Sequence, residues 1–238
     1  VMAVNNEVGS IQPIQEISDL LANEPTISFH VDAVQAIGKI PVSAYLTDRV
    51  DFATFSGHKF HAVRGVGFVY KKAGKKITPF LTGGGQEKDL RSTTENVAGI
   101  ASMAKALRLV TDKEEFSLSK IAKMKKIIFD DLAKYEDITI FSGEGEDFAP
   151  NILTFGIKGV RGEVVVHAFE EHQIYISTTS ACSSKAGKPA GTLISMGVPT
   201  KLAQTAVRIS LDDDNDMGQV EQFLTIFKQV YAKTQKVR

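Results

Sequence analysis

The sequence predicts an α/β region followed by a smaller α+β domain, and three observations support this fold class. Short apolar segments alternate with turns and one helix in the first third of the chain. Two helical patterns dominate the middle, and the last third returns to alternating strands and helices. Strands interleaved with helices are typical of a sheet with helical crossovers, and 238 residues are enough to bury a core.

The first third is predicted to contain one helix and three strands. The helix is expected from Ile14 to Leu21, where apolar residues recur at helical spacing. The strands are expected over the apolar, β-branched and aromatic segments 26–31, 50–55 and 66–70.

The middle of the chain predicts two helices and a loop. The spacing i, i+3, i+4, i+7 predicts one buried helix face made of Val97, Ile100, Ala101, Ala104 and Leu107. A second, lysine-rich helix repeats the pattern with Ile121, Met124, Ile128 and Leu132. From Phe141 to Pro150 the composition shifts to Gly, Glu and Asp, which favours a loop.

The last part is expected to form the α+β domain. Strands are predicted over 151–157, 174–177 and 206–211, the last because Val207, Ile209 and Leu211 alternate with polar or small residues. One helix face is expected at Val164, Val165, Ala168, Phe169 and His172. A closing amphipathic helix is expected from Val220, Phe223, Leu224, Phe227 and Tyr231.

Composition and charge exclude several classes of protein. The chain has 28 Lys+Arg against 28 Asp+Glu, so its net charge of +0 gives no electrostatic reason to expect nucleic acid or an anionic membrane as partner. Its one cysteine excludes an intramolecular disulfide and a cysteine-rich zinc site, and no histidine cluster predicts a metal. No segment approaches the roughly 18–20 apolar residues of a membrane span. The basic patches 71–72, 75–76 and 123–126 are expected to be solvated faces.

Lys59 and Asp32 are the first candidates for chemistry. Lys59 follows the predicted strand 50–55, where desolvation can lower the pKa of an amine and make it a nucleophile. Asp32 ends the preceding strand, and a lysine plus an aspartate are the two groups that pyridoxal phosphate (PLP) demands. Two structural alternatives remain open: Lys59 as an ordinary surface lysine, and Asp32 as the cap of a helix starting near Ala33.

Beyond this pair, an ordered set of motifs resembles the signature of cysteine desulfurases of the NifS/IscS type, PLP enzymes of the class V aminotransferase group. The match runs from Val1 to about Leu211, over the segments VNNEVG at 4–9, HVDAVQ at 30–35, SGHK at 56–59, GGGQE at 83–87, RSTTEN at 91–96, SACSS at 180–184 and VRISL at 207–211. The resemblance implies the C-terminal part of a PLP-dependent fold type I large domain, with a mostly parallel sheet, over 1–110. A connecting helix and a small α+β domain would then occupy 111–238.

The resemblance also assigns site roles. Lys59 would be the Schiff-base lysine and proton carrier, and Asp32 would pair with the pyridine nitrogen. Gln35 would bond the phenolic oxygen, whereas Ser56, His58 and, from the other subunit of a homodimer, Thr94 would hold the phosphate. For the substrate, Arg208 would bind the carboxylate, as a guanidinium does well, and Asn5 would lie between cofactor and substrate.

Cys182 is expected to be a nucleophile rather than a buried apolar residue. It lies among small and polar residues that favour a loop, and a loop can carry a thiolate into a pocket. The resemblance makes Cys182 the residue that attacks the sulfur of L-cysteine and becomes a persulfide. It further implies a cytoplasmic enzyme that hands sulfur to an iron–sulfur scaffold, a tRNA thiolase or a thiamine-pathway protein.

Two departures from the family pattern bear on these expectations. Thr93 stands where many members have glycine, and its Cβ restricts a positive φ. The N-terminal segment that carries a ring-stacking histidine in the family precedes the point matching Val1, so the chain is expected to be part of a longer enzyme. On its own it is expected to bind PLP weakly and to show negligible turnover.

The sequence leaves three candidate functions open. The first is a cysteine desulfurase converting L-cysteine to L-alanine. The second is a selenocysteine lyase or a class V aminotransferase, although an aminotransferase needs no thiol such as that of Cys182. The third is a non-catalytic dimerisation or partner-binding fragment.

Overall fold

The computed structural model describes residues 1–179 and 191–235. Two compact units make up the chain, and each is described by itself. Unit 1 comprises Val1–Ala3 and Gln12–Glu114, and unit 2 comprises Val4–Ile11 and Glu115–Arg238. The predicted domains 1–110 and 111–238 stay a prediction.

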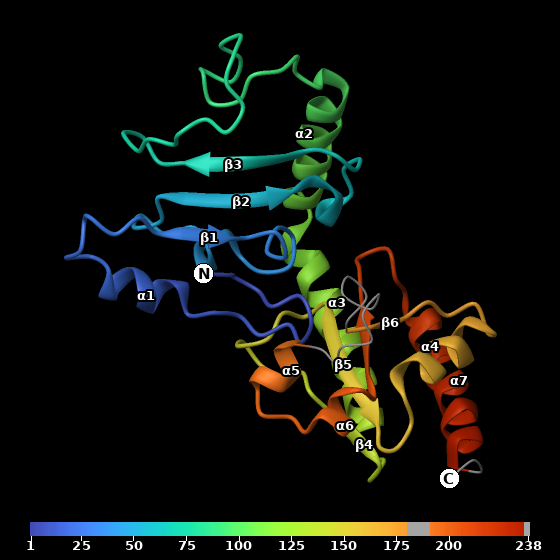
Figure 1. The fold of residues 1–238 in the computed structure, drawn as a ribbon. Helices are drawn as coiled ribbons and strands as arrows, with labels where there is room; N and C mark the ends of the chain where they lie inside the picture. Colours follow the sequence, from blue (N-terminus) through green and yellow to red (C-terminus); the bar gives the residue numbers. More distant parts are fainter. Residues whose placement is uncertain (180–190, 236–238) are drawn as a thin grey trace. The chain divides into compact units, whose positions relative to one another are not determined.

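Unit 1 is built on a three-stranded sheet in the order β1-β2-β3 (Figure 1), with β1 (His30–Asp32), β2 (Phe52–Ser56) and β3 (Gly67–Lys71). β1 and β2 are parallel, while β2 and β3 are antiparallel. Residues 1–3 run alongside β1 in parallel, through hydrogen bonds of Asp32 N to Val1 O and of Ala3 N to Asp32 O, both 2.8 Å. The remaining elements of unit 1 are α1 (Ile14–Leu20), η1 (Val42–Ala44), η2 (Gly57–Phe60) and α2 (Val97–Thr111).

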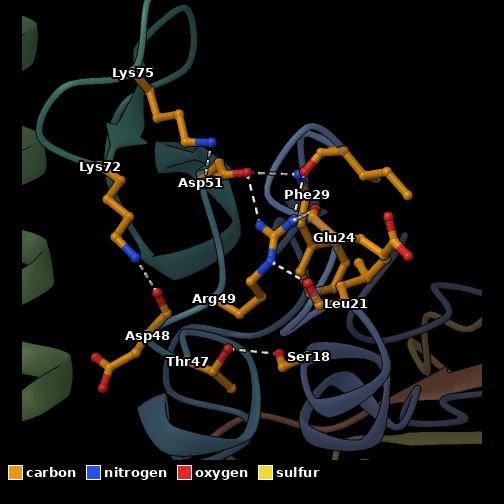
Figure 2. Close-up of polar contacts among 11 residues, drawn as sticks. Ser18, Leu21, Glu24, Phe29, Thr47, Asp48, Arg49, Asp51, Lys72 and Lys75 are labelled. Atoms are coloured by element: carbon orange, nitrogen blue, oxygen red, sulfur yellow. Dashed lines mark hydrogen bonds and ion pairs between the residues drawn. The ribbon is translucent and has the colours of Figure 1, made fainter.

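An ionic cluster holds the segments that lead into β1 and β2 (Figure 2). The Asp51 carboxylate, 2% exposed, accepts hydrogen bonds from Arg49 Nη1 and from the amide of Phe29, both at 2.9 Å, and Lys75 Nζ lies 3.0 Å from its other oxygen. Arg49 also donates to the carbonyls of residues 21, 24 and 27. The cluster fixes the amino ends of both strands. The expectation that the basic patch 75–76 is a solvated face is therefore wrong for Lys75, which pairs with a buried carboxylate.

β1 is shorter than the predicted strand 26–31. The amide of Ile27 donates to the carbonyl of Glu24 at 3.1 Å, which closes a turn, and the Ile27 carbonyl accepts from Arg49. These groups are therefore not available to a strand ladder, and the strand begins at His30. The predicted helix 14–21 is confirmed as α1.

The predicted buried face of α2 is wrong. Val97 and Ile100 are exposed, whereas Gly99, Met103 and Ala106 are buried. A Cβ on Gly99 would lie 2.4 Å from Cγ1 of Val66, so the bare glycine lets the chain beside η2 approach the helix. The buried face of α2 is therefore the one that carries Gly99, because the missing side chain lets Val66 come close to the helix. Hydrophobic periodicity does not encode such a close approach.

Unit 2 is a four-stranded sheet covered by three helices on one face. The strand order is β4-β5-β7-β6, with β4 (Ile138–Ile140), β5 (Ile152–Ile157), β6 (Ser177–Thr178) and β7 (Ala206–Ser210), all pairs antiparallel. The helices are α3 (Glu114–Leu132), α4 (Gly162–Glu170), α5 (Gly191–Ser195), α6 (Thr200–Ala203) and α7 (Met217–Gln235). The predicted strand 174–177 is displaced to β6. The predicted helix face at Val164, Val165, Ala168, Phe169 and His172 is only partly right, because Val164 is exposed and His172 lies beyond the end of α4. The other elements predicted in this unit are confirmed.

The two faces of this sheet have different partners. Leu153, Phe155, Val207 and Ile209 belong to the main core, which also takes in side chains of α3, α4 and α7. On the opposite face, a smaller cluster joins Val8, Phe141, Leu193, Ala203 and Ala206. The period-2 alternation of β5 and β7 thus sends Thr154 and Arg208 to the face of Val8 and Ala206.

Lys125 is buried, so the expectation that the basic patch 123–126 is a solvated face is wrong at this residue. It lies on α3 within the basic patch 123–126 but is 6% exposed, and its Nζ donates to the carbonyl of Ala149 at 3.0 Å. Burial lowers its pKa to about 8, while the Glu144 carboxylate acts in the opposite direction. Helical period places Lys125 beside Met124 at the edge of the core.

The helices of the described ranges, 1–179 and 191–235, include none with both the length and the apolar character to span a membrane.

Candidate functional site

The carboxyl ends of β1 and β2 form the candidate site of unit 1. Because the strands are parallel, these ends meet at one edge of the sheet, the edge where α/β proteins bind ligands. Asp32 is the last residue of β1 and Ser56 the last of β2. His30, Asp32, Thr54 and Ser56 alternate with buried neighbours and therefore share one face of the sheet.

Asp32 is half-buried and held by its own turn. Its Oδ1 accepts a hydrogen bond from the amide of Val34 at 3.0 Å, so the side chain does cap the chain that follows. That chain is a series of turns rather than a helix. Within the described part of the chain, neither Lys, Arg nor His makes an ion pair with Asp32. Among the same residues, the second carboxylate oxygen makes no hydrogen bond.

Lys59 and His58 lie in η2, directly after β2. Both side chains are exposed, and they make no hydrogen bond or ion pair with other residues of the described ranges. Gly57 permits this tight connection, because a Cβ there would lie 3.0 Å from both the Val66 carbonyl and the Ala62 Cβ. The turn ends at His61, which adopts a left-handed φ of 70°.

Thr54 joins the site although sequence reasoning missed it. It is the register partner of Asp32, and its Oγ1 lies 3.1 Å from Nε2 of His30. The signal that reveals it is strand register, which requires the pairing of β1 with β2. His30 consequently packs beside the candidate site.

Gln35 and Thr94 occupy loops of the same unit. Gln35 is half-buried in the turns after β1, while Thr94 is exposed just before Asn96, whose side chain caps α2 by accepting from the amide of Gly99. Thr93 does not adopt a positive φ, so its Cβ imposes no strain. Earlier in the same loop, three consecutive residues take left-handed φ values: 52° at Glu87, 55° at Lys88 and 65° at Asp89.

Unit 2 contains both Asn5 and Arg208, and Arg208 bonds the residue that follows Asn5. Asn5 Oδ1 accepts from the amides of Glu7 and Val8 at 2.8 and 2.9 Å, which closes a turn at residues 5–9, named here the Asn5 turn. Arg208 Nη1 donates to the carbonyl of Asn6 at 2.7 Å. One guanidinium group is thereby fixed against the turn that carries Asn5. Cys182 lies outside the described residues.

The donor set of unit 1 fits PLP. Among the described residues, the Asp32 carboxylate meets no cationic side chain and would suit a pyridinium. The Lys59 amine would suit the cofactor aldehyde, and Ser56 and His58 would suit a phosphate. Asp32, Gln35, Ser56, His58 and Lys59 are the residues of this unit that would hold the cofactor.

Comparisons with known proteins show the family of the chain. The model of the family described as Aminotransferase class-V matches residues 1–223. The chain belongs to the class-V aminotransferase family. Its relatives include proteins named as NifS/IscS homologues and cysteine desulfurases.

Individual relatives of this class-V group are similar throughout the chain. A "NifS/IcsS protein homolog" from Lactobacillus delbrueckii subsp. bulgaricus is 48% identical over 100% of the chain and 62% of its own length. A "Cysteine desulfurase IscS" from Dictyoglomus turgidum is 36% identical over 89% of the chain and 53% of its own length. The X-ray structure of a NifS-like protein from Rickettsia africae has a TM-score of 0.85 at 32% identity, over 97% of the chain and 61% of its own. The chain therefore spans about three-fifths of the length of such relatives.

Proposed function

We propose that the whole protein is a PLP-dependent cysteine desulfurase that converts L-cysteine to L-alanine and collects the sulfur on Cys182. The observation that supports this most is the set of polar groups at one sheet edge, in a chain similar to cysteine desulfurases. These groups are the Asp32 carboxylate, which meets no cationic side chain of the described residues, and the side chains of Ser56, His58 and Lys59. Because the chain covers only part of its relatives' length, activity, substrate and partners are proposals.

The cofactor-binding residues would hold PLP in two ways, by charge and by hydrogen bonds. When bound, PLP supplies an electron-withdrawing ring that stabilises negative charge at the substrate Cα. Asp32 would keep the ring nitrogen protonated, Gln35 would bond the phenolic oxygen, and Ser56, His58 and the other subunit's Thr94 would hold the phosphate. Lys59, exposed directly after β2, would carry the proton between Cα and the cofactor.

The substrate-binding residues come from unit 2. Arg208 would bind the carboxylate of L-cysteine, since a planar guanidinium matches the geometry of a carboxylate and the bond from Nη1 to Asn6 O fixes its position. Asn5 would present its amide Nδ2 beside the cofactor, because its Oδ1 is engaged within the turn. Both side chains thereby orient the substrate.

Cys182 would accept the sulfur. Its thiolate attacks the sulfur atom of the bound L-cysteine, a sulfur–sulfur bond forms, and the carbon–sulfur bond breaks. The two electrons of that bond stay on the carbon, which takes up a proton and leaves as L-alanine. The outer sulfur of the persulfide on Cys182 then passes to a sulfur-acceptor protein such as an iron–sulfur scaffold, a tRNA thiolase or a thiamine-pathway protein. The enzyme would act as a homodimer in the cytoplasm.

Variants of the whole protein loaded with PLP test this function. Cys182→Ala should abolish release of alanine and transferable sulfur from L-cysteine, while Ser183→Ala, one position along, should retain both. Survival of selenocysteine cleavage in Cys182→Ala, with no desulfuration in the wild type, would indicate a selenocysteine lyase. Amino-group transfer to a keto acid would indicate an aminotransferase. The absence of all three reactions and of cofactor absorbance would indicate a non-catalytic module.

The cofactor affinity of residues 1–238 alone is a separate prediction. Visible absorbance after incubation with PLP and alanine release from L-cysteine would both be measured on this chain. Weak absorbance and negligible turnover are expected.

A further inference from the structure

Consecutive carbonyl oxygens of the Asn5 turn each accept a hydrogen bond from unit 2. The donors come from four separate places in the chain: Arg208 Nη1 to Asn6 O at 2.7 Å, Thr154 Oγ1 to Glu7 O at 2.5 Å, Ser142 Oγ to Val8 O at 2.8 Å and Ala149 N to Gly9 O at 2.7 Å. A turn with every one of these carbonyls occupied has little freedom to rotate its peptide planes.

The two hydroxyl donors are deeply buried and linked to each other. Thr154 is 0% exposed and Ser142 is 3% exposed. The amide of Thr154 donates to Ser142 Oγ at 2.8 Å, so the Ser142 hydroxyl accepts from β5 and donates to the turn. Buried hydroxyls hold their partners firmly because a lost bond leaves an unsatisfied carbonyl.

Strand register connects this anchor to Arg208. Thr154 and Arg208 are direct partners in the antiparallel pair β5–β7, so their side chains share a face about 5 Å apart. They donate to the carbonyls of adjacent residues, Glu7 and Asn6. A shift of the turn at Glu7 therefore moves the acceptor of Arg208 as well.

We propose that Thr154, assisted by Ser142, is a positioning residue for substrate binding: it fixes the Asn5 turn and, through the turn, the orientation of Arg208. The proposal rests on the proposed function, in which Arg208 binds the carboxylate of L-cysteine. Thr154 does not itself touch the substrate. Its hydroxyl sets the geometry of two groups that do.

Thr154→Val tests the proposal, because valine keeps the shape of threonine and removes only the hydroxyl. In the whole protein with PLP, the KM for L-cysteine should rise about tenfold while kcat changes less than about twofold. Thr154→Ser, which restores the hydroxyl, should return KM to within about twofold of the wild type. Cofactor absorbance should be unchanged in both variants.

Thr205→Val is the matched control. Thr205 is also a buried threonine of unit 2 whose hydroxyl donates to a backbone carbonyl, Leu202 O at 2.7 Å, but it makes no bond to the Asn5 turn. It should lower the melting temperature to a similar extent as Thr154→Val and leave KM unchanged.

The outcomes separate the two proposals. A wild-type protein that loads PLP but releases no alanine from L-cysteine would refute the proposed function. An active wild type in which Thr154→Val and Thr205→Val have the same KM, or in which Thr154→Ser fails to rescue KM, would overturn the positioning role. If Thr154→Val does not fold, Ser142→Ala takes its place, with an expected rise of KM of about fivefold, and an unchanged KM would again contradict the proposal.

Discussion

Nη1 of Arg49 lies 2.9 Å from Oδ2 of Asp51. This pair closes a cluster that bonds backbone groups of residues 21, 24, 27 and 29 and so holds the amino ends of β1 and β2. Figure 2 shows the guanidinium directed at the carboxylate and at the preceding loop. The candidate PLP residues lie at the opposite, carboxyl ends of the same strands. The cluster therefore stabilises β1 and β2 at their amino ends and makes no contact with the candidate site.

Asp51→Asn is expected to destabilise the protein by about 2–4 kcal/mol, because Arg49 and Lys75 would then lack their shared anion. Burial alone would raise the pKa of Asp51, but the Phe29 amide, Lys75 and Arg49 together lower it. A carboxyl with a lowered folded pKa stabilises above its unfolded pKa and loses this effect as pH falls through the folded value. Denaturant unfolding of the variant and wild type should thus differ at pH 7, and the difference should shrink as the pH falls through the lowered pKa of Asp51. Asp19→Asn, at an exposed site, should differ little from the wild type across this pH range.

Lys125 gives a second prediction for pH. Its folded pKa of about 8 is below its ordinary value, mainly through burial, so the unfolded chain binds more protons between the two values. The free energy of unfolding should consequently rise by about 1–2 kcal/mol between pH 7 and pH 9.5, relative to Lys125→Met. Lys123→Met, at an exposed position of the same helix, serves as the control and should show no such difference. Parallel pH profiles for Lys125→Met and the wild type would contradict the prediction.

Arg208→Lys keeps the charge but removes the planar fork. A lysine cannot hold the Asn6 carbonyl and bind a carboxylate through two parallel bonds at once. The KM for L-cysteine should rise about tenfold to a hundredfold, with cofactor absorbance retained. Arg161→Lys, at an exposed arginine, should behave as the wild type. Equal KM values for the two variants would exclude Arg208 from carboxylate binding.

Gly9→Ala should destabilise unit 2 and disturb the Asn5 turn. Gly9 has a φ of 79°, and a Cβ there would lie 3.0 Å from Cβ of Ile152. Gly145 has a φ of 89° with nothing within 4 Å of such a Cβ, so Gly145→Ala isolates the cost of the backbone conformation. Thermal or denaturant unfolding should show a loss of about 1 kcal/mol for Gly145→Ala and about 2–3 kcal/mol for Gly9→Ala. A larger loss for Gly145→Ala would refute the role of contact with Ile152.

Local patterns predicted much of the fold. The face Ile121, Met124, Ile128 and Leu132 is buried as expected, because a long amphipathic helix packs by its apolar stripe. The face expected for α2 is wrong, since the bare backbone of Gly99 makes the contact with Val66. Strand 26–31 is too long because Arg49, distant in sequence, takes the Ile27 carbonyl. Close approach and long-range ion pairing do not appear in a periodic pattern.

The sequence by itself determined the family, and it predicts the residues of the expected chemistry, since the motifs around Asp32, Lys59 and Arg208 are local and their residue types suit PLP and a carboxylate. Only the tertiary structure decided what holds them. Thr54 joins Asp32 through parallel register, and Thr154, Ser142 and Ala149 reach the Asn5 turn from positions more than 130 residues away. Hydrogen bonds across such separations depend on which strands pair and in what register, and a linear sequence of polar residues does not state this.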